Sequence, residues 1–326
     1  SDVYKRQVSG LVVEDGGDFF SVATAKIKVV LDKTTSLMKV INLTTEAVVL
    51  EETAPAVFDK DEVTLRLKEA PDEYFYGGGV QNGRFSHKGR TIAIENQNSW
   101  TDGGVASPNP FYWSTKGYGL MWHTFRKGTY DFGREEAGVV KLSHETDYLD
   151  LFVMVDDGAV ALLNDFYQLT GHPVLLPKFG FYQGHLNAYN RDYWKEDENG
   201  ILFEDGKRYK ESQKDNGGIK ESLNGEKNNY QFSARAVIDR YKHHDMPLGW
   251  LLPNDGYGAG YGQTGTLDGN VQNLKDLTTY AHKNGVEIGL WTQSDLHPKA
   301  GVEPLLQRDI VKEVRDAGVR VLKTDV

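Results

Sequence analysis

The first half of the chain alternates apolar and polar residues in short runs. These runs lie at Ser21–Val30, Val63–Leu67, Thr91–Ile94, Tyr118–Phe125 and Leu149–Val155. Clusters rich in Gly, Pro, Asn and Asp separate them, among them Gly77–Gly79. A period of two residues is typical of strands with one buried face, and many short strands between turn signals favour a β-sandwich. We therefore predict an N-terminal β-sandwich domain over residues 8–157.

The period changes after this region. Ala159–Leu169 places its apolar residues at helical spacing, and Gly171 follows as a helix stop. Pro173 and Pro177 prevent the helix from continuing, because proline lacks the backbone N–H that a helix interior needs. We interpret residues 158–177 as a linker helix and a junction between domains.

Strands and helices alternate in the rest of the chain, residues 178–326. The expected strands are Phe179–Gln183, Leu248–Leu252, Val286–Trp291 and Val319–Leu322. The expected helices are Ser233–His244, with Ser233 as N-cap, Asn270–Asn284 and Leu305–Ala317; Gly285 and Gly318 close the last two. This rhythm predicts a parallel sheet, either an open doubly wound sheet or part of a (β/α)8 barrel.

A polar segment over residues 190–229 separates the first expected strand from its helix, and we interpret it as an insertion at the rim of the sheet. Ile201–Phe203 and Lys207–Tyr209 flank a Glu-Asp-Gly turn and predict a small hairpin. Its acidic and amide residues could hold calcium, although they lack the spacing of an EF-hand loop. These residues are Asp197, Glu198, Asn199, Glu204 and Asp205. No other cofactor and no metal site is expected.

Composition narrows the function classes. The chain of 326 residues has a formal net charge of -10, which argues against nucleic acid or an acidic membrane as a partner. It has no cysteine, so thiolate metal sites, disulfides and cysteine nucleophiles are excluded. An uncharged oligosaccharide is compatible with both facts.

Ser1–Gln7 resembles a translated adapter, so we expect a non-native start and leave localisation and oligomeric state open.

Polar and aromatic residues recur where the expected strands end. They are Gln183, His185 and Asn187 after the first strand, Asn254, Asp255 and Tyr257 after the second, Trp291, Gln293, Ser294 and Asp295 at the third, and Lys323 and Asp325 at the fourth. Active sites of parallel α/β barrels lie at these carboxyl ends. Taken singly, Asp255 and Asp325 could instead cap the next helix, and Trp291 could simply pack. Paired carboxyl groups suit glycosidic cleavage, because one stabilises or attacks the oxocarbenium-like centre while another protonates the leaving oxygen.

Several of these strings are similar to motifs of glycoside hydrolase family 31. They are the junction Tyr167–Phe181, the string Lys323-Thr-Asp325, and the sandwich segments Tyr76–Gly83 and Asn109–Ser114. The resemblance runs from about Tyr74 to Val326. It implies a galactose-mutarotase-like sandwich followed by the first half of a (β/α)8 TIM barrel, truncated after strand four. It also implies a retaining enzyme whose nucleophile is Asp325, with the general acid/base beyond the fourth strand and so absent from this chain.

Within the family, three strings are similar to the cycloalternan-forming group of isomaltosyl- and glucosyltransferases: Gln81–Lys88, Glu95–Gly104 and Pro253–Gly258. This similarity implies α-glucan or isomalto-oligosaccharide substrates and transfer of a glucosyl or isomaltosyl unit. We expect substrate contacts from Asp255, Trp291, Gln293, His185, Asn98 and Trp100. The chain departs from most of the family in carrying Lys323 two residues before Asp325, where a tryptophan is usual. It also carries Asn254-Asp255-Gly256-Tyr257-Gly258 on strand two, where many hydrolases of the family have Asp-x-Asp-Tyr-Met, which puts plain maltose-type hydrolysis in doubt.

Two other readings stay open. A non-catalytic carbohydrate-binding protein could use Trp100, Trp113 and Tyr112 of the sandwich to bind glycans. An unrelated barrel, such as a phosphate-binding lyase, is disfavoured because no glycine-rich phosphate loop opens a helix here. For the chain as it stands we expect no glycosidase activity and poor solution behaviour, since half of a barrel leaves strand edges unpaired.

Overall fold

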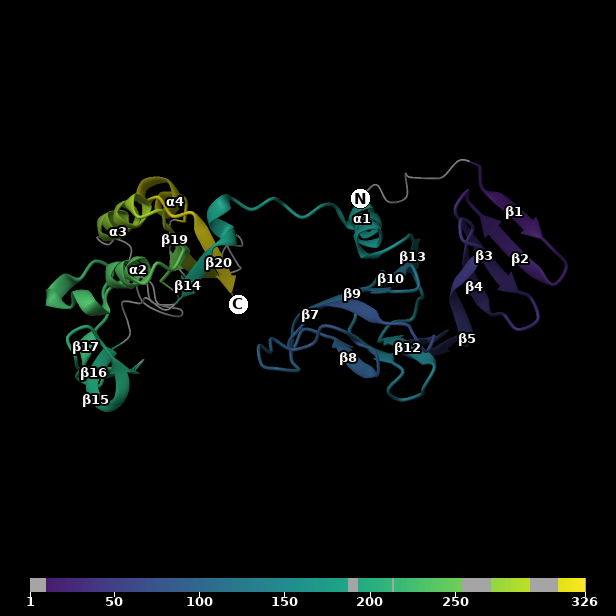
Figure 1. Ribbon diagram of the computed structural model, residues 1–326, viewed down its shortest axis with the longest axis horizontal. Helices are drawn as coiled ribbons and strands as arrows, with labels where there is room; N and C mark the ends of the chain where they lie inside the picture. The colour runs from purple at the N-terminus through teal and green to yellow at the C-terminus, as the bar shows by residue number, and fades with distance from the viewer. Residues whose placement is uncertain (1–9, 187–192, 213, 254–270, 294–309, 326) are drawn as a thin grey trace, which may run out of the picture. The chain divides into compact units, whose positions relative to one another are not determined.

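The computed structural model describes residues 10–186, 193–212, 214–253, 271–293 and 310–325 (Figure 1). The chain forms two compact units, Ser1–Pro173 and Val174–Val326. The division falls within residues 158–177, the stretch interpreted above as a junction. Each unit is built around its own buried cluster of apolar side chains.

The described part of the first unit contains two antiparallel sheets. The larger has the order β1-β2-β3-β4-β5-β6-β12-β11-β8 and the smaller β13-β10-β9-β7. The strands are β1 Val12–Asp15, β2 Phe19–Ala23, β3 Ile27–Asp32, β4 Met38–Asn42, β5 Ala47–Asp59, β6 Glu62–Lys68, β7 Phe75–Gln81, β8 Arg90–Ile94, β9 Val105–Ser114, β10 Tyr118–Trp122, β11 Gly128–Phe132, β12 Val139–His144 and β13 Leu151–Val155.

Side chains from both sheets form the core between them. In β6 the alternate residues Val63, Leu65 and Leu67 are fully buried, which is the expected result of a period of two with one face inward. They pack in one cluster with Trp122 of β10 and Tyr112 of β9. Each fully buried side chain of this size contributes roughly 1.5–3 kcal/mol of hydrophobic stabilisation, so the core accounts for much of the unit's stability.

Two sequence predictions in this unit are wrong in detail. The run Ser21–Val30 is not one strand but the hairpin of β2 and β3, which pair antiparallel through Val22 and Val29. Gly77–Gly79 do not separate strands; they lie inside β7 with φ of 115°, 75° and 79°. A Cβ on Gly79 would lie 2.1 Å from the carbonyl oxygen of Ser107, so close approach to β9 requires glycine there.

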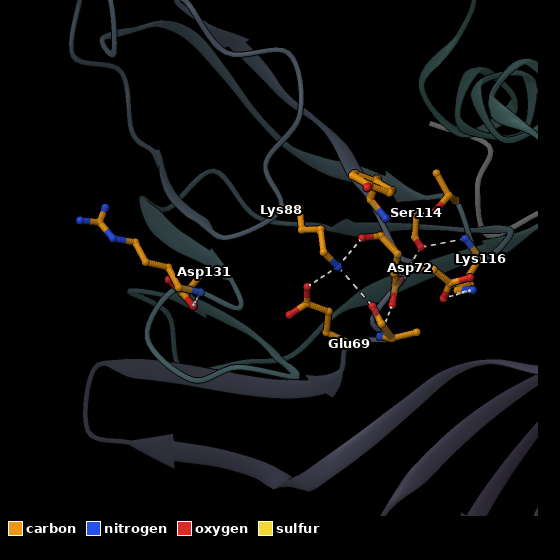
Figure 2. Close-up of polar contacts among 11 residues, drawn as sticks. Glu69, Asp72, Lys88, Ser114, Lys116 and Asp131 are labelled. Atoms are coloured by element: carbon orange, nitrogen blue, oxygen red, sulfur yellow. Dashed lines mark hydrogen bonds and ion pairs between the residues drawn. The ribbon is translucent and has the colours of Figure 1, made fainter.

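A buried carboxyl group joins the start of β7 to the end of β9. Glu73 is 2% exposed; its Oε2 accepts a hydrogen bond from the Ala70 N–H at 2.9 Å, and its Oε1 accepts one from the Ser114 hydroxyl. Figure 2 shows Lys88 beside this group, with its Nζ 2.9 Å from Glu69 Oε1. The pKa of Glu73 is raised, chiefly because the carboxyl group is buried. The hydrogen bonds from Ala70 and Ser114 to Glu73 fix the position at which β7 begins.

Helix α1, Ala159–Thr170, covers part of the outer face of the smaller sheet (Figure 1). Its fully buried Leu162 packs with Phe111 of β9 and Met154 of β13. Gly171 ends the helix with φ of 88°, as the sequence predicts. This outer face therefore has its own apolar cluster, separate from the core.

The described part of the second unit contains a parallel sheet of the order β14-β18-β19-β20. Its strands are β14 Gln183–Leu186, β18 Leu248–Leu252, β19 Glu287–Gln293 and β20 Val321–Asp325; its helices are α2 Ala234–His243, α3 Val271–Lys283 and α4 Ile310–Ala317. Ile288 and Leu290 of β19 pack against Leu274 and Leu277 of α3. The predicted parallel sheet is thus present, with its strands adjacent in chain order.

Local signals place the helices well and the first strand poorly. Ser233 caps α2, since its hydroxyl oxygen accepts a hydrogen bond from the Ala236 N–H at 3.1 Å. Gly285 and Gly318 have φ of 75° and 82°, as predicted for helix-ending glycines. The strand expected at Phe179–Gln183 is wrong: Lys178–Phe181 is a 3-10 turn, and β14 begins only at Gln183.

The insertion forms a three-stranded antiparallel sheet rather than a hairpin alone. Its order is β16-β15-β17, with β15 Tyr193–Leu202, β16 Arg208–Ser212 and β17 Ile219–Lys220. Two 3-10 turns follow, Glu226–Asn228 and Tyr230–Phe232. Trp194, Tyr209 and Phe232 are buried together, with Phe203 against them, so the insertion has a small apolar core. This core explains an ordered fold in a segment that is mostly polar.

Candidate active site

The carboxyl edge of the parallel sheet brings two of the predicted site residues together. Gln293 of β19 is paired in register with Asp325 of β20, and Trp291 is paired with Lys323 two residues earlier on each strand. Adjacent strands lie about 4.8 Å apart, so these backbones are direct neighbours. The predicted nucleophile therefore stands at the end of a strand whose neighbour ends in a predicted substrate-binding residue.

Trp291 is packed at this edge rather than open to solvent. It is 5% exposed, and the alternate residues Ile288 and Leu290 of the same strand belong to the helix-facing core. Both Trp291 and Lys323 make further interactions. The sequence allowed two interpretations of Trp291, packing in the protein or contact with a substrate. The observed burial agrees with packing, and substrate contact stays a prediction.

His185 lies near the carboxyl end of β14, at the opposite edge of the same sheet. Its Nδ1 is 3.1 Å from the hydroxyl of Tyr241 on α2. Burial lowers the pKa of His185, and the positive charge of Arg240 lowers it further. The ring is therefore neutral near pH 7, where it can donate one hydrogen bond and accept another. Asp255, the other predicted contact in this region, lies outside the described residues.

The two sandwich strings singled out from the sequence lie against each other. The Asn82 side chain donates a hydrogen bond to the carbonyl of Ser99 at 2.6 Å, and its backbone N–H donates to Gly104 at 3.0 Å. These bonds hold the loop between β8 and β9, which carries Asn98 and Trp100. Asn98 is exposed with φ of 46°, and Trp100 is 75% exposed. Both are accessible to a ligand.

One sequence interpretation of this surface is wrong, and one feature was missed. Tyr112, proposed for glycan binding, is 0% exposed and its hydroxyl meets that of Tyr118 at 3.2 Å. Its neighbour Trp113 instead stacks on Tyr76, with ring centroids 4.5 Å apart, and Tyr76 contacts the exposed Phe85. Trp113, Tyr76 and Phe85 therefore form a row of aromatic rings, because the antiparallel register of β7 and β9 places Tyr76 opposite Trp113. A single sequence does not give this register, so the row could not be predicted.

Two of the acidic residues considered for calcium, Glu204 and Asp205, bind other groups of the protein. Asp205 accepts hydrogen bonds from the Lys207 N–H at 3.0 Å and the Tyr209 hydroxyl at 2.7 Å, and Glu204 pairs with Arg240. Within the described ranges no group of three or more His, Asp or Glu residues is placed to hold a metal ion. The structure thus gives no support to calcium at Asp197–Asp205.

Over the described ranges, no helix has the length and apolarity needed to cross a membrane.

Comparison with known proteins finds a family model that matches most of the first unit. Residues 1–131 match the family model described as the glycosyl hydrolase 31 N-terminal galactose mutarotase-like domain. Residues 1–131 are therefore similar to the N-terminal domain of glycoside hydrolase family 31. This match agrees with the mutarotase-like character predicted for the sandwich, whose strands are antiparallel over the described residues.

Curated proteins that resemble this chain include α-xylosidases. This chain is 26% identical to α-xylosidase XylQ of Lactiplantibacillus pentosus over 193 residues, and the aligned region covers 57% of this chain and 25% of that protein. It is 28% identical over 131 residues to an α-xylosidase of Emericella nidulans, covering 40% and 17%. The chain thus spans a quarter or less of the length of these two relatives.

Several solved structures share the fold of this chain. The dextranase of Flavobacterium johnsoniae complexed with glucose has a TM-score of 0.64 at 14% identity, covering 87% of this chain and 31% of that chain. The cycloalternan-forming enzyme of Listeria monocytogenes, in complex with a pentasaccharide substrate, has a TM-score of 0.66 at 15% identity, covering 91% and 28%. At this identity the likeness concerns the fold alone.

Proposed function

We propose that this chain belongs to a retaining α-glycosidase or transglycosylase in which Asp325 is the nucleophile. The observation that carries the proposal is the position of Asp325, the last residue of β20, in register with Gln293 at the carboxyl edge of a parallel sheet. Ligands of parallel α/β folds bind at this edge. The family 31 N-terminal domain in the same chain supports glycoside chemistry.

The order of the strands supports a barrel. An open doubly wound sheet reverses its strand order at a switch point, whereas a barrel adds each strand beside the one before. Here β14, β18, β19 and β20 follow one another without reversal in the part of the chain that the structure describes. We infer that they are the first four strands of a (β/α)8 barrel, with residues 190–229 as an insertion at its rim.

In the proposed reaction the Asp325 carboxylate attacks the anomeric carbon, and the glycosidic bond breaks. A carboxylic acid donates its proton to the leaving oxygen, and a covalent glycosyl-enzyme remains. Water then releases the free sugar, or the hydroxyl of an acceptor sugar completes a transfer. We assign no general acid/base among the residues of this chain, so the chain alone is expected to leave isomaltose and panose uncleaved.

The substrate class that we propose is an α-glucan or an isomalto-oligosaccharide, with Asp255, Gln293 and Trp291 contributing contacts at the cleaved bond. The structural neighbours that act on dextran or form cycloalternan support this choice. The names of the curated relatives favour α-xylosides instead. Turnover of isomaltose and panose, measured beside that of p-nitrophenyl α-xyloside in the enzyme that carries this chain, separates the two. Oligosaccharides longer than the substrate among the products indicate transfer.

A mechanism-based label tests the nucleophile directly. 5-Fluoro-α-glucosyl fluoride needs little protonation of its leaving group, so it reports on the attacking carboxylate alone. We expect the enzyme that carries this chain to gain one fluoroglucosyl group, located by peptide mass spectrometry at Asp325. Asp325→Ala should abolish labelling and turnover while leaving the circular dichroism spectrum unchanged. A label on another carboxylate, or turnover by Asp325→Ala at the wild-type rate, would refute the assignment.

The alternative function, a carbohydrate-binding protein without catalytic activity, relied on Trp100, Trp113 and Tyr112. Tyr112 cannot contact a glycan, because it is buried in the core. Trp100 remains exposed, so the sandwich could still contribute to glycan contacts. Absence of both labelling and turnover, together with retained binding of isomaltose, would favour that alternative.

A further inference from the structure

A cavity of about 220 Å³ lies within the second unit, where β14, α2 and the insertion meet. The 3-10 turn Tyr230–Phe232 contributes to it as well. Its walls include the rings of Trp194, Phe203 and Phe232, and Val237 of α2 lines it as well. Polar side chains of β14, β16, α2 and the 3-10 turn complete much of the lining. One water needs about 10–15 Å³ of such volume, so the cavity has room for a ligand of several heavy atoms.

The walls of this cavity are held in place by interactions between the insertion and α2. Arg240 donates a hydrogen bond from Nη2 to Glu204 Oε2 at 3.0 Å, and its guanidinium lies 5.0 Å from the centre of the Phe203 ring. Ser233, another lining residue, is fixed as the N-cap of α2. Trp194 stacks on Phe232 with centroids 5.6 Å apart. The cavity is therefore a built feature of the fold rather than a gap beside a loose loop.

The polar side chains of the lining offer both donors and acceptors. Glu221 and Glu211 are carboxylate acceptors, and Glu221 Oε1 is already 2.6 Å from the Trp194 indole nitrogen. Over the described ranges, Nε2 of His185, Nη1 of Arg240 and the carboxylate of Glu211 have no protein partner. A ligand in this cavity can therefore receive and donate hydrogen bonds while it rests against aromatic carbon.

Charge narrows the class of ligand. Arg240 is paired with Glu204 and His185 is neutral, so the carboxylate of Glu211 leaves a negative charge on the lining. Anions are therefore repelled. A metal ion is disfavoured, since the described residues form no cluster of three metal-binding side chains. Neutral polyhydroxyl groups match a site of mixed donors and acceptors with apolar walls.

We propose that this cavity binds one monosaccharide unit of a neutral oligosaccharide, as an accessory site separate from the site of bond cleavage. It adjoins β14, three strands away from β20 in the sheet, which is about 14 Å at the usual strand spacing. A second, open groove of about 740 Å³ shares Phe203, Gln231 and Arg240 with the cavity and continues over Ile201 and Leu202. The next sugar units extend along that groove.

The experiment titrates the 326-residue chain and its Asp325→Ala variant with isomaltose and with maltose, using saturation-transfer NMR and calorimetry. Val237→Phe fills the cavity and should weaken binding about tenfold or more, and Glu211→Ala should weaken it several-fold through the lost hydrogen bond. Glu198→Ala is the matched control, an exposed carboxylate on the same small sheet that does not line the cavity. Its affinity should equal that of the parent.

The outcomes separate this proposal from the proposed function. Binding that persists in Asp325→Ala and falls in Val237→Phe supports the accessory site, whether or not the enzyme is labelled at Asp325. Binding that requires Asp325 and ignores Val237→Phe places the sugar at the strand ends and overturns the proposal. So does the absence of any saccharide binding by a folded chain, or a stronger response to tetramethylammonium than to isomaltose, which would identify a cation site. Melting curves of each variant confirm that the chain is folded.

Discussion

Replacing Gly79 by alanine tests how closely β7 must approach β9. The added Cβ would lie 2.1 Å from Ser107 O, 2.6 Å from Asn109 N and 2.7 Å from Pro108 C, all of them backbone atoms that cannot rotate away. Overpacking of this kind is destabilising by about 1–3 kcal/mol. The φ of 79° adds about 1–2 kcal/mol for an L residue in the left-handed region. We expect a loss of about 2–5 kcal/mol.

Gly89 provides the matched control. Its φ is 67°, and a Cβ there would meet nothing within 4 Å, so Gly89→Ala should lose only the backbone contribution of about 1–2 kcal/mol. Because two units need not unfold together, the assay should be local. Hydrogen exchange followed by mass spectrometry of peptides covering β7 and β9 gives the opening free energy of this pair. Equal losses for the two variants would refute the close-approach argument.

Two further predictions concern a cap and a buried acid. Ser233→Ala removes the hydroxyl acceptor at the start of α2 and should lower the unfolding free energy of the second unit by about 1 kcal/mol; an unchanged urea midpoint, with Ser99→Ala as control, would contradict this. Glu73 has a folded-state pKa raised chiefly by burial, so its stabilising contribution is fully present below the unfolded pKa and declines as pH rises through the folded one. Glu73→Gln should therefore flatten the fall in unfolding free energy above about pH 4.5, and parallel pH profiles for the two proteins would count against it.

Periodic patterns predicted the kinds of elements and their order. The alternation in Val63–Leu67 predicted β6, and the strand expected at Leu248–Leu252 is β18 as observed. The helix signals at Ser233, Gly285 and Gly318 are local, because a cap or a left-handed residue acts on its own turn. The start of α2 and the ends of the helices before Gly285 and Gly318 could therefore be predicted from the sequence.

Features that depend on distant partners were not predictable. Gly77–Gly79 resembled a turn, and only the approach of β9 explains why glycine stands inside a strand. The polar insertion gave no sign that Trp194, Tyr209 and Phe232 would meet in a small core. Within the candidate site, the pairing of Gln293 with Asp325 follows from strand register. The role of each residue came from motif resemblance and not from the pattern.

The chain order of β14, β18, β19 and β20 has a consequence for synthesis on the ribosome. Each parallel strand pairs with the one made just before it, for instance Trp250 with Glu287 and then Gly289 with Val321, so the sheet can grow as the polypeptide emerges. The larger sandwich sheet cannot, because β6 pairs Val63 with His144 and must wait for β12. Pairing across such a separation is slow to form. During translation β6 therefore remains an open edge while the following strands are made, and that interval is the period when the nascent sandwich is most exposed to aggregation.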